Sequence, residues 1–290
     1  MSSEPAVSGR ATGDAPGTGA HTLRTRLDQA LSGPFVGMVP WIILGVFEGP
    51  GRTQWAVLVG LLFAIGFLIL DRVQGRSVKL LTSVSALYFL ILLIVVFTVG
   101  DQTVDWLEIW LGEISNISLT VIVLGSMAIR LPFTLQYARE QTPRELWDSP
   151  VFLRINYVIT GAWALAFLVS SAAGFYGDYV LGDNNDIWTG WVIQVGAMLM
   201  AVEFTAWYPD HARAHAITRA GGTPDQPAPP VTELFAPLTV WFIPIGIISL
   251  VLDAAPTWLG IAFIVVGVVL SGVLRRDLEK ERTTDAGDGR

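Results

Sequence analysis

The chain has no cysteine, three histidines and only two lysines. The lack of cysteine excludes disulfides, thiolate nucleophiles, cysteine-ligated zinc and iron–sulfur clusters. Lys79 and Lys280 lie beside apolar runs rather than within them, so neither is placed to carry a retinal Schiff base inside a helix bundle. No basic run is long enough to bind nucleic acid. We therefore expect no cofactor and no nucleic-acid partner.

Charged residues are also scarce. They make up 15% of the 290 residues, whereas hydrophobic residues make up 52%. Soluble domains contain roughly 25% charged residues. This composition excludes an ordinary soluble domain and predicts an integral membrane protein whose main surroundings are the lipid bilayer.

Eight apolar runs approach the roughly 20 residues that a membrane-crossing helix needs. They are Leu31–Phe47, Trp55–Leu70, Leu80–Val99, Leu107–Ile129, Ile155–Phe175, Trp188–Trp207, Leu234–Leu252 and Trp258–Leu274. We predict an all-α polytopic membrane helix bundle of about eight transmembrane helices over residues 31–274. The first two runs and the last are short, which leaves open whether they span fully. Residues 1–30 are predicted to be a disordered cytoplasmic tail, and residues 275–290 a charged cytoplasmic tail.

The distribution of basic residues predicts the orientation. With eight crossings and a cytoplasmic N-terminus, every Lys and Arg except Arg52 falls on the inner side, as the positive-inside rule requires. Two predicted outer loops, Gly100–Asp105 and Gly177–Asp186, are acidic. The strong preference for Arg over Lys is typical of GC-rich coding. We therefore expect a bacterial plasma (inner) membrane protein with both termini inside.

The inner loop from Arg130 to Arg154 is the most structured connection. Thr142-Pro143-Arg144-Glu145 matches a capping box with Pro at the first helical position, which predicts a short helix through Leu146 and Trp147. Ser149-Pro150 is predicted to cap the fifth membrane helix. The loop is either an ordered connector or a surface for a partner or lipid headgroup. The candidate partner residues are Arg139, Arg144, Glu145 and Trp147.

Glu203 lies deep in the sixth apolar run. A charge within a membrane span normally faces the bundle interior and has a partner. Its candidate partners at that depth are Arg130, Arg154 and Asn156. Glu203 is therefore either a proton or ion site, or part of a buried pair that holds helices together.

Three further features could contribute to a site. Glu113 is predicted to look into the bundle from the outer part of the fourth helix. Pro237 and Pro244 predict a kink or a broken segment in the seventh helix. His211 and His215 share a helix face, but further ligands are lacking, so we predict no metal site.

The order of features from about Leu31 to Tyr208 resembles the bacterial intracellular septation protein A family. The matching pieces are Gly37-Met38-Val39-Pro40, Asp71-Arg72, the segment Leu131–Gln136, Trp147 and Asn156. Members of that family are usually shorter, so the last two helices have no counterpart. The resemblance implies a small multispanning inner-membrane protein with a role in envelope integrity or cell division, acting through membrane partners and without known catalysis.

Two functions therefore follow as hypotheses. The first is a non-enzymatic septation or cell-envelope protein that acts through helix contacts and the inner loop, with other membrane or division proteins as partners. The alternative is a small transporter or channel that uses Glu203, together with Glu113. An enzyme acting on lipid is least favoured, because no polar cluster at one interface can be assembled from the sequence.

Overall fold

The computed structural model describes residues 34–182, 186–251 and 256–288, and it describes side chains from residue 36 to residue 274 within these ranges. Every regular element in the described part is helical. The predicted N-terminal tail lies outside the described residues. The last helix, α11 (Thr257–Asp288), includes most of the predicted C-terminal tail in its backbone.

Seven helical segments of the described chain are long and apolar enough to cross a membrane. They are α3 (Thr53–Val73), α4 (Leu80–Thr98), α5 (Asp101–Ala128), α7 with its extension η3 (Pro150–Phe175 and Tyr176–Leu181), η4 with α8 (Trp188–Val192 and Ile193–Arg219), α9 with α10 (Val231–Thr239 and Phe242–Val251), and the part of α11 up to Leu274. The described part of the chain is all-helical, and the protein is a multi-pass membrane protein, as predicted.

The first predicted run is shorter than the others. It forms η1 (Pro34–Met38) and α2 (Val39–Phe47), whose apolar helix Val36–Phe47 is too short to count among the seven. Two short elements, α6 (Phe133–Glu140) and η2 (Arg144–Leu146), lie between α5 and α7.

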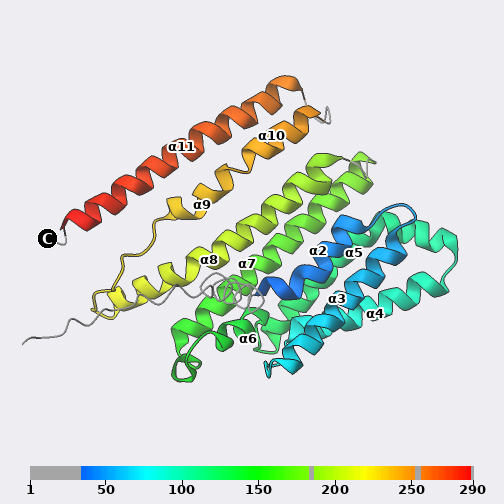
Figure 1. Ribbon diagram of the computed structural model, residues 1–290, viewed down its shortest axis with the longest axis horizontal. Helices are drawn as coiled ribbons and strands as arrows, with labels where there is room; N and C mark the ends of the chain where they lie inside the picture. The colour runs from blue at the N-terminus through cyan, green and yellow to red at the C-terminus, as the bar shows by residue number, and fades with distance from the viewer. Residues whose placement is uncertain (1–33, 183–185, 252–255, 289–290) are drawn as a thin grey trace, which may run out of the picture.

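Helix α7 is at the centre of the bundle. It packs against α5 on one side and α8 on the other, while α2, α3 and α4 form a neighbouring group (Figure 1). In the most apolar 18-residue stretch of its span, 56% of the residues are buried, compared with 11% in the corresponding stretches of the α8 and α11 spans. Side chains that face α7 therefore lie in the interior of the protein.

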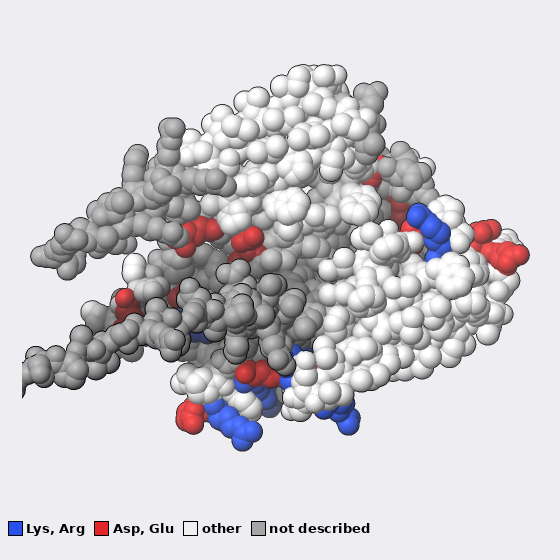
Figure 2. Space-filling model, in the orientation of Figure 1, with Lys and Arg blue, Asp and Glu red and all other residues white. Residues whose placement is uncertain are grey.

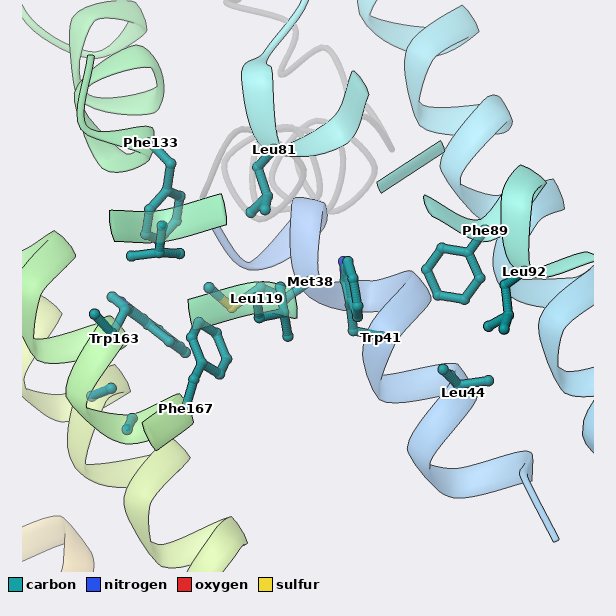
Figure 3. Close-up of a cluster of buried hydrophobic side chains, with 14 of the residues drawn as sticks. Met38, Trp41, Leu44, Leu81, Phe89, Leu92, Leu119, Phe133, Trp163 and Phe167 are labelled. Carbon is teal, nitrogen blue, oxygen red and sulfur yellow. The ribbon is translucent and has the colours of Figure 1, made fainter. Parts of the chain in front are cut away.

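The hydrophobic core continues from α2 into α7. Trp41 stacks on Tyr88 of α4 with ring centroids 4.5 Å apart, and its indole nitrogen donates to Ser85 Oγ at 2.8 Å. Figure 3 shows Trp41 beside Phe89, while Trp163 and Phe167 lie on the other side of Met38 and Leu119. Burial of these apolar side chains explains why the short α2 is held within the bundle.

The last two helices form a separate hairpin. A Cβ added to Gly246 of α10 would meet Gly260 O of α11 at 2.6 Å, so two glycines allow these backbones to approach closely. The break predicted within the apolar run Leu234–Leu252 is confirmed, because α9 ends at Thr239 and α10 starts at Phe242. Pro244 cannot donate to the Val240 carbonyl four residues earlier. The hairpin contacts the main bundle through α9 and through the Trp188–Phe263 ring pair, 5.5 Å apart.

Both predicted outer loops are shorter in the structure than the sequence suggested. Helix α5 already starts at Asp101, and a carboxylate in the first turn is favourable at a helix N-terminus. Helix α7 continues past Phe175 as the π-helical segment η3 to Leu181, so Asp178 belongs to a helix rather than to a loop. The predicted loop Gly177–Asp186 was therefore wrong over Gly177–Leu181.

Charged side chains lie mainly at the margins of the molecule, with a broad uncharged surface between them (Figure 2). We call the end where α5 begins and α7 finishes the acidic end, and the end where α3 finishes and α7 begins the basic end. The acidic end carries Glu48, Asp101, Glu108 and Asp178, and the basic end carries Arg72, Arg76, Lys79, Arg139 and Arg154.

Candidate functional site

The basic end contains a buried ionic cluster. Lys79 Nζ lies 3.0 Å from Asp71 Oδ1 and 3.3 Å from Glu140 Oε1, and its side chain is only 2% exposed. Gln136 Oε1 accepts from the Leu80 amide at 2.6 Å, which joins α6 to the start of α4. Burial raises the pKa of the Tyr137 phenol beside this cluster, with a further rise from the charges of Asp71 and Glu140. The cluster holds α3, α4 and α6 together.

The inner loop has the predicted short helix but not the predicted capping box. Arg144–Leu146 is a single 3-10 turn without a side-chain cap, and Trp147 Nε1 donates to the Thr142 carbonyl at 2.9 Å. Ser149 does cap α7, because its Oγ accepts from the Phe152 amide at 3.2 Å.

Two arginines flank the indole ring of this loop. Arg139 and Arg144 place their guanidinium carbons 5.2 and 5.6 Å from the Trp147 ring centroid, and Glu145 is exposed beside them. We call Arg139, Arg144 and Trp147 the loop clamp.

The proposed partners of Glu203 do not reach it. Glu203 is half-buried, and no hydrogen bond or ion pair joins it to another described residue. Ala201 and Thr205 of α8 face α7, which places Glu203 on the opposite side of the helix, where Trp207 one turn later bonds the Pro230 carbonyl before α9. The expected grouping of Glu203 with Arg130, Arg154 and Asn156 was therefore wrong.

Those three residues have other positions. Arg130 is exposed and has a φ of 61°, so it ends α5 in the left-handed conformation. Asn156 is buried in α7, where its Nδ2 donates to the Phe152 carbonyl at 2.9 Å. Arg154 is exposed on the side of α7 that faces α8.

The acidic end contains a pair of carboxyls, of which Glu113 is buried and Asp178 is half-buried. Glu113 points into the bundle as predicted, is 6% exposed, and hydrogen-bonds Asp178 of η3. A Cβ on Gly174 of α7 would overlap Glu113 Oε1, so only glycine leaves room for this carboxyl. Two carboxyl groups can share a hydrogen bond only when one of them keeps its proton. We call Glu113 and Asp178 the carboxyl pair.

Amide side chains adjoin the carboxyl pair. Gln194 Nε2 donates to the Thr189 carbonyl at 3.0 Å, and Asn116 Nδ2 donates to Gln194 Oε1 at 3.4 Å. Glu48, just after α2, lies near the pair; burial raises the pKa of its carboxyl, and the charge of Glu113 raises it further. No Lys or Arg forms an ion pair with these carboxyls within the described residues.

A cavity of about 490 Å³ between α5 and α7 reaches Glu113 of the carboxyl pair from the surface. Glu113 and Ser171 supply polar groups to a lining that is otherwise mostly apolar. The remaining lining residues are Trp106, Trp110, Ile114, Ile117, Leu168, Ala172 and Phe175. Glu113 is therefore accessible from the membrane-facing side, although it is buried in the bundle.

Polar groups continue from the carboxyl pair along the buried face of α7. Asn156, Thr160, Trp163, Ser170, Gly174 and Asp178 follow one another at helical spacing of three, four or seven residues. Thr160 bonds Thr134 at 2.8 Å and Trp163 Nε1 donates to Thr205 at 3.0 Å. The Ser170 hydroxyl is fully buried and meets no partner among the described residues. We call this series the polar face of α7.

Sequence reasoning missed three of these residues. Asp178 was assigned to a loop, Lys79 was noted only as a flank, and Ser170 was not singled out. The small and polar residues of α7 at helical spacing were the available signal for the polar face. The signal for the ionic cluster was Lys79 itself, one of only two lysines in a chain whose other basic residues are arginines.

The chain matches no family model, and no curated protein or solved structure is significantly similar to it. The resemblance to the septation protein A family therefore remains a prediction from sequence.

Proposed function

We propose that this protein carries protons across a bacterial plasma membrane, with the carboxyl pair as its proton-binding site. In this proposal α2 also crosses, so that there are eight crossings, and the basic end and both termini face the cytoplasm according to the positive-inside rule. The observation that carries the proposal is the buried Glu113 carboxyl, hydrogen-bonded to the half-buried Asp178 at the end of the polar face of α7.

The length of the polar face supports this function. Asn156 and Asp178 are separated by a distance of roughly 30 Å along the helix at about 1.5 Å per residue, which matches the hydrocarbon thickness of a bilayer. Ionisable groups within membrane spans commonly belong to proton or ion pathways. A hydroxyl without a partner, as at Ser170, is available to bond a water molecule on such a path.

The chemistry of the pair favours a proton over a metal ion. Among the described residues, no three or more His, Asp or Glu side chains are grouped so that they could hold a metal. Glu113 and Asp178 share one hydrogen bond, so a proton can leave one carboxyl while the other accepts. The Gln194 and Asn116 amides keep the surroundings polar without adding charge.

The test is proton flux in proteoliposomes containing the full chain and a trapped pH-sensitive dye, driven by a potassium diffusion potential. We expect wild-type flux above that of empty liposomes and at least a tenfold loss in Glu113→Gln. This substitution preserves the shape of the side chain but removes its titration.

Glu203→Gln is the matched control, because it makes the same chemical change on the side of α8 away from the polar face. It should keep wild-type flux. Loss of flux in Glu203→Gln with normal flux in Glu113→Gln would transfer the function to Glu203. Absence of flux in the wild-type protein would overturn the transport proposal.

A septation or envelope role through membrane partners is the second candidate, and the loop clamp favours it. An indole ring with two adjacent guanidinium groups is exposed enough to meet a partner, and Trp and Arg are enriched where binding energy concentrates at interfaces. In-cell crosslinking should capture division or envelope proteins with the wild type and lose them in Arg144→Ala with Trp147→Ala. Leu146→Ala, an exposed neighbour, is the control. Capture that persists in the double variant would exclude the loop as the partner surface.

A further inference from the structure

A second pocket lies at the basic end between α7 and α8. It has a volume of about 270 Å³, and its charged and imidazole lining residues are Arg154 from α7 and His211, His215 and Arg219 from α8. No Asp or Glu contributes to the lining. The remaining lining residues are Val151, Ile155, Tyr208, Ala212 and Ala216. The pocket therefore combines apolar walls with groups that attract anions.

Neither arginine of the pocket is neutralised within the described part of the chain. No ion pair or hydrogen bond joins the side chain of Arg154 or Arg219 to another described residue, and both residues are exposed. Arg213, on the same helix, differs because it lies 3.2 Å from Asp210 and does not line the pocket. Two guanidinium groups that line one pocket without a carboxylate are well suited to bidentate hydrogen bonds with a phosphate.

The imidazole wall of the pocket is held rigidly. His211 Nδ1 lies 3.1 Å from the Pro229 carbonyl, which can only accept, so this nitrogen carries the hydrogen. The His211 ring stacks on Trp207 at 4.3 Å and meets the edge of His215 at 4.5 Å. The linker before α9 therefore positions one side of the pocket.

The location of the pocket narrows the class of ligand that it can accept. It lies where the apolar part of α7 and α8 ends, beside Trp207 and Tyr208, and aromatic residues of this kind lie at membrane interfaces. Its volume is below the roughly 300–1,000 Å³ of pockets that enclose whole small molecules. A headgroup whose acyl chains remain in the bilayer fits such a site, and basic pockets between membrane helices bind anionic headgroups.

We infer that the pocket of Arg154, Arg219, His211 and His215 binds the phosphate of an anionic phospholipid from the leaflet at the basic end. The two arginines hold the phosphate oxygens, and Ile155 and Ala212 contact the start of the acyl chains. This site is separate from the carboxyl pair and does not depend on the proposed proton transport.

The experiment is native mass spectrometry of the full-length protein in detergent, titrated with phosphatidylglycerol or with phosphatidylcholine of the same acyl chains. We expect wild type to prefer phosphatidylglycerol, and Arg154→Gln with Arg219→Gln to lose that preference by roughly tenfold or more, since each arginine near an anionic lipid strengthens binding by roughly fivefold. Arg213→Gln is the matched control and should bind as wild type does.

Three outcomes overturn the assignment. Equal retention of both lipids by wild type, or an unchanged preference in the double variant, excludes this pocket as an anionic-lipid site. Inorganic phosphate tests the other source of the same chemistry: a rise in Tm with phosphate as large as with phosphatidylglycerol would make the ligand a free phosphate.

Both arginines are exposed, so the variants should fold. The charge-preserving Arg154→Lys with Arg219→Lys should retain most of the preference for phosphatidylglycerol.

Discussion

The basic and acidic ends of the bundle both bury ionisable side chains, but they compensate them in different ways. At the basic end, Lys79 neutralises Asp71 and also contacts Glu140. At the acidic end, Glu113 and Asp178 have each other and neighbouring amides, and no cation pairs with them in the described part of the chain. A compensated cluster keeps its charges and holds helices together, whereas an uncompensated carboxyl pair is suited to gain and lose a proton.

The largest effect should come from removing the cation of the basic end. Lys79→Met leaves the Asp71 and Glu140 carboxylates close together without a cation, and breaking a buried ion pair costs about 3–5 kcal/mol. We expect a large fall in Tm measured in detergent by light scattering and intrinsic fluorescence. Adding Asp71→Asn should restore part of the stability. Arg72→Met is the control, because Arg72 follows Asp71 in the sequence and is exposed. An equal Tm for Lys79→Met and Arg72→Met would refute the role of the cluster.

A smaller effect is expected where Glu113 packs against the backbone of α7. Gly174→Ala places a methyl group on the carboxyl of Glu113, and overpacking of this kind costs roughly 1–3 kcal/mol. The Tm should fall, and Glu113→Ala in the same chain should recover it by removing the overlap. Gly161→Ala on the same helix meets no atom within 4 Å, so it should leave the Tm unchanged or raise it. Equal effects of the two glycine variants would contradict the packing described here.

The smallest effect concerns the pH dependence of stability at the acidic end. Burial raises the pKa of Glu48 in the folded protein, so folding favours its protonated form. The resulting stabilisation is complete below the unfolded pKa of about 4.3 and is lost as pH rises through the raised folded pKa. Wild type should therefore lose more Tm than Glu48→Gln between pH 5 and pH 8.

Glu145→Gln provides the comparison for this pH series, because Glu145 is exposed in the inner loop. Its Tm should follow that of wild type across the same range. Parallel curves for wild type and Glu48→Gln would show that Glu48 does not titrate differently in the folded state.

Much of the helix layout could be predicted from local patterns. The run from Ile155 to Phe175 predicted α7, Ser149-Pro150 predicted its cap, and Pro244 predicted the break before α10. These features depend on hydrophobic length and on backbone hydrogen bonds between residues close in sequence. The ends of helices were less predictable, because Asp101 and Asp178 are polar yet helical.

The candidate site was predictable only in part. Glu113 was correctly expected to face the interior, but its partner Asp178 lies on another helix, 65 residues later in the sequence numbering. Glu203 had the same sequence signal as Glu113, a carboxylate in an apolar run, and yet it faces away from α7. Which face of α8 is buried depends on the helices that pack against it, and the sequence of this chain does not show which helices those are.

The sequence by itself determined that this chain is a multi-pass helical membrane protein, since about 20 consecutive apolar residues form a helix in a bilayer to satisfy their own backbone hydrogen bonds. The tertiary structure alone decided which ionisable groups meet. It joins Lys79 to α6 and brings Glu113 to Gly174 and Asp178, while it leaves Arg154 and Arg219 free of carboxylates around a shared pocket. Helices are local structures, but the environment of a charge is set by side chains from distant segments, and only packing brings those segments together.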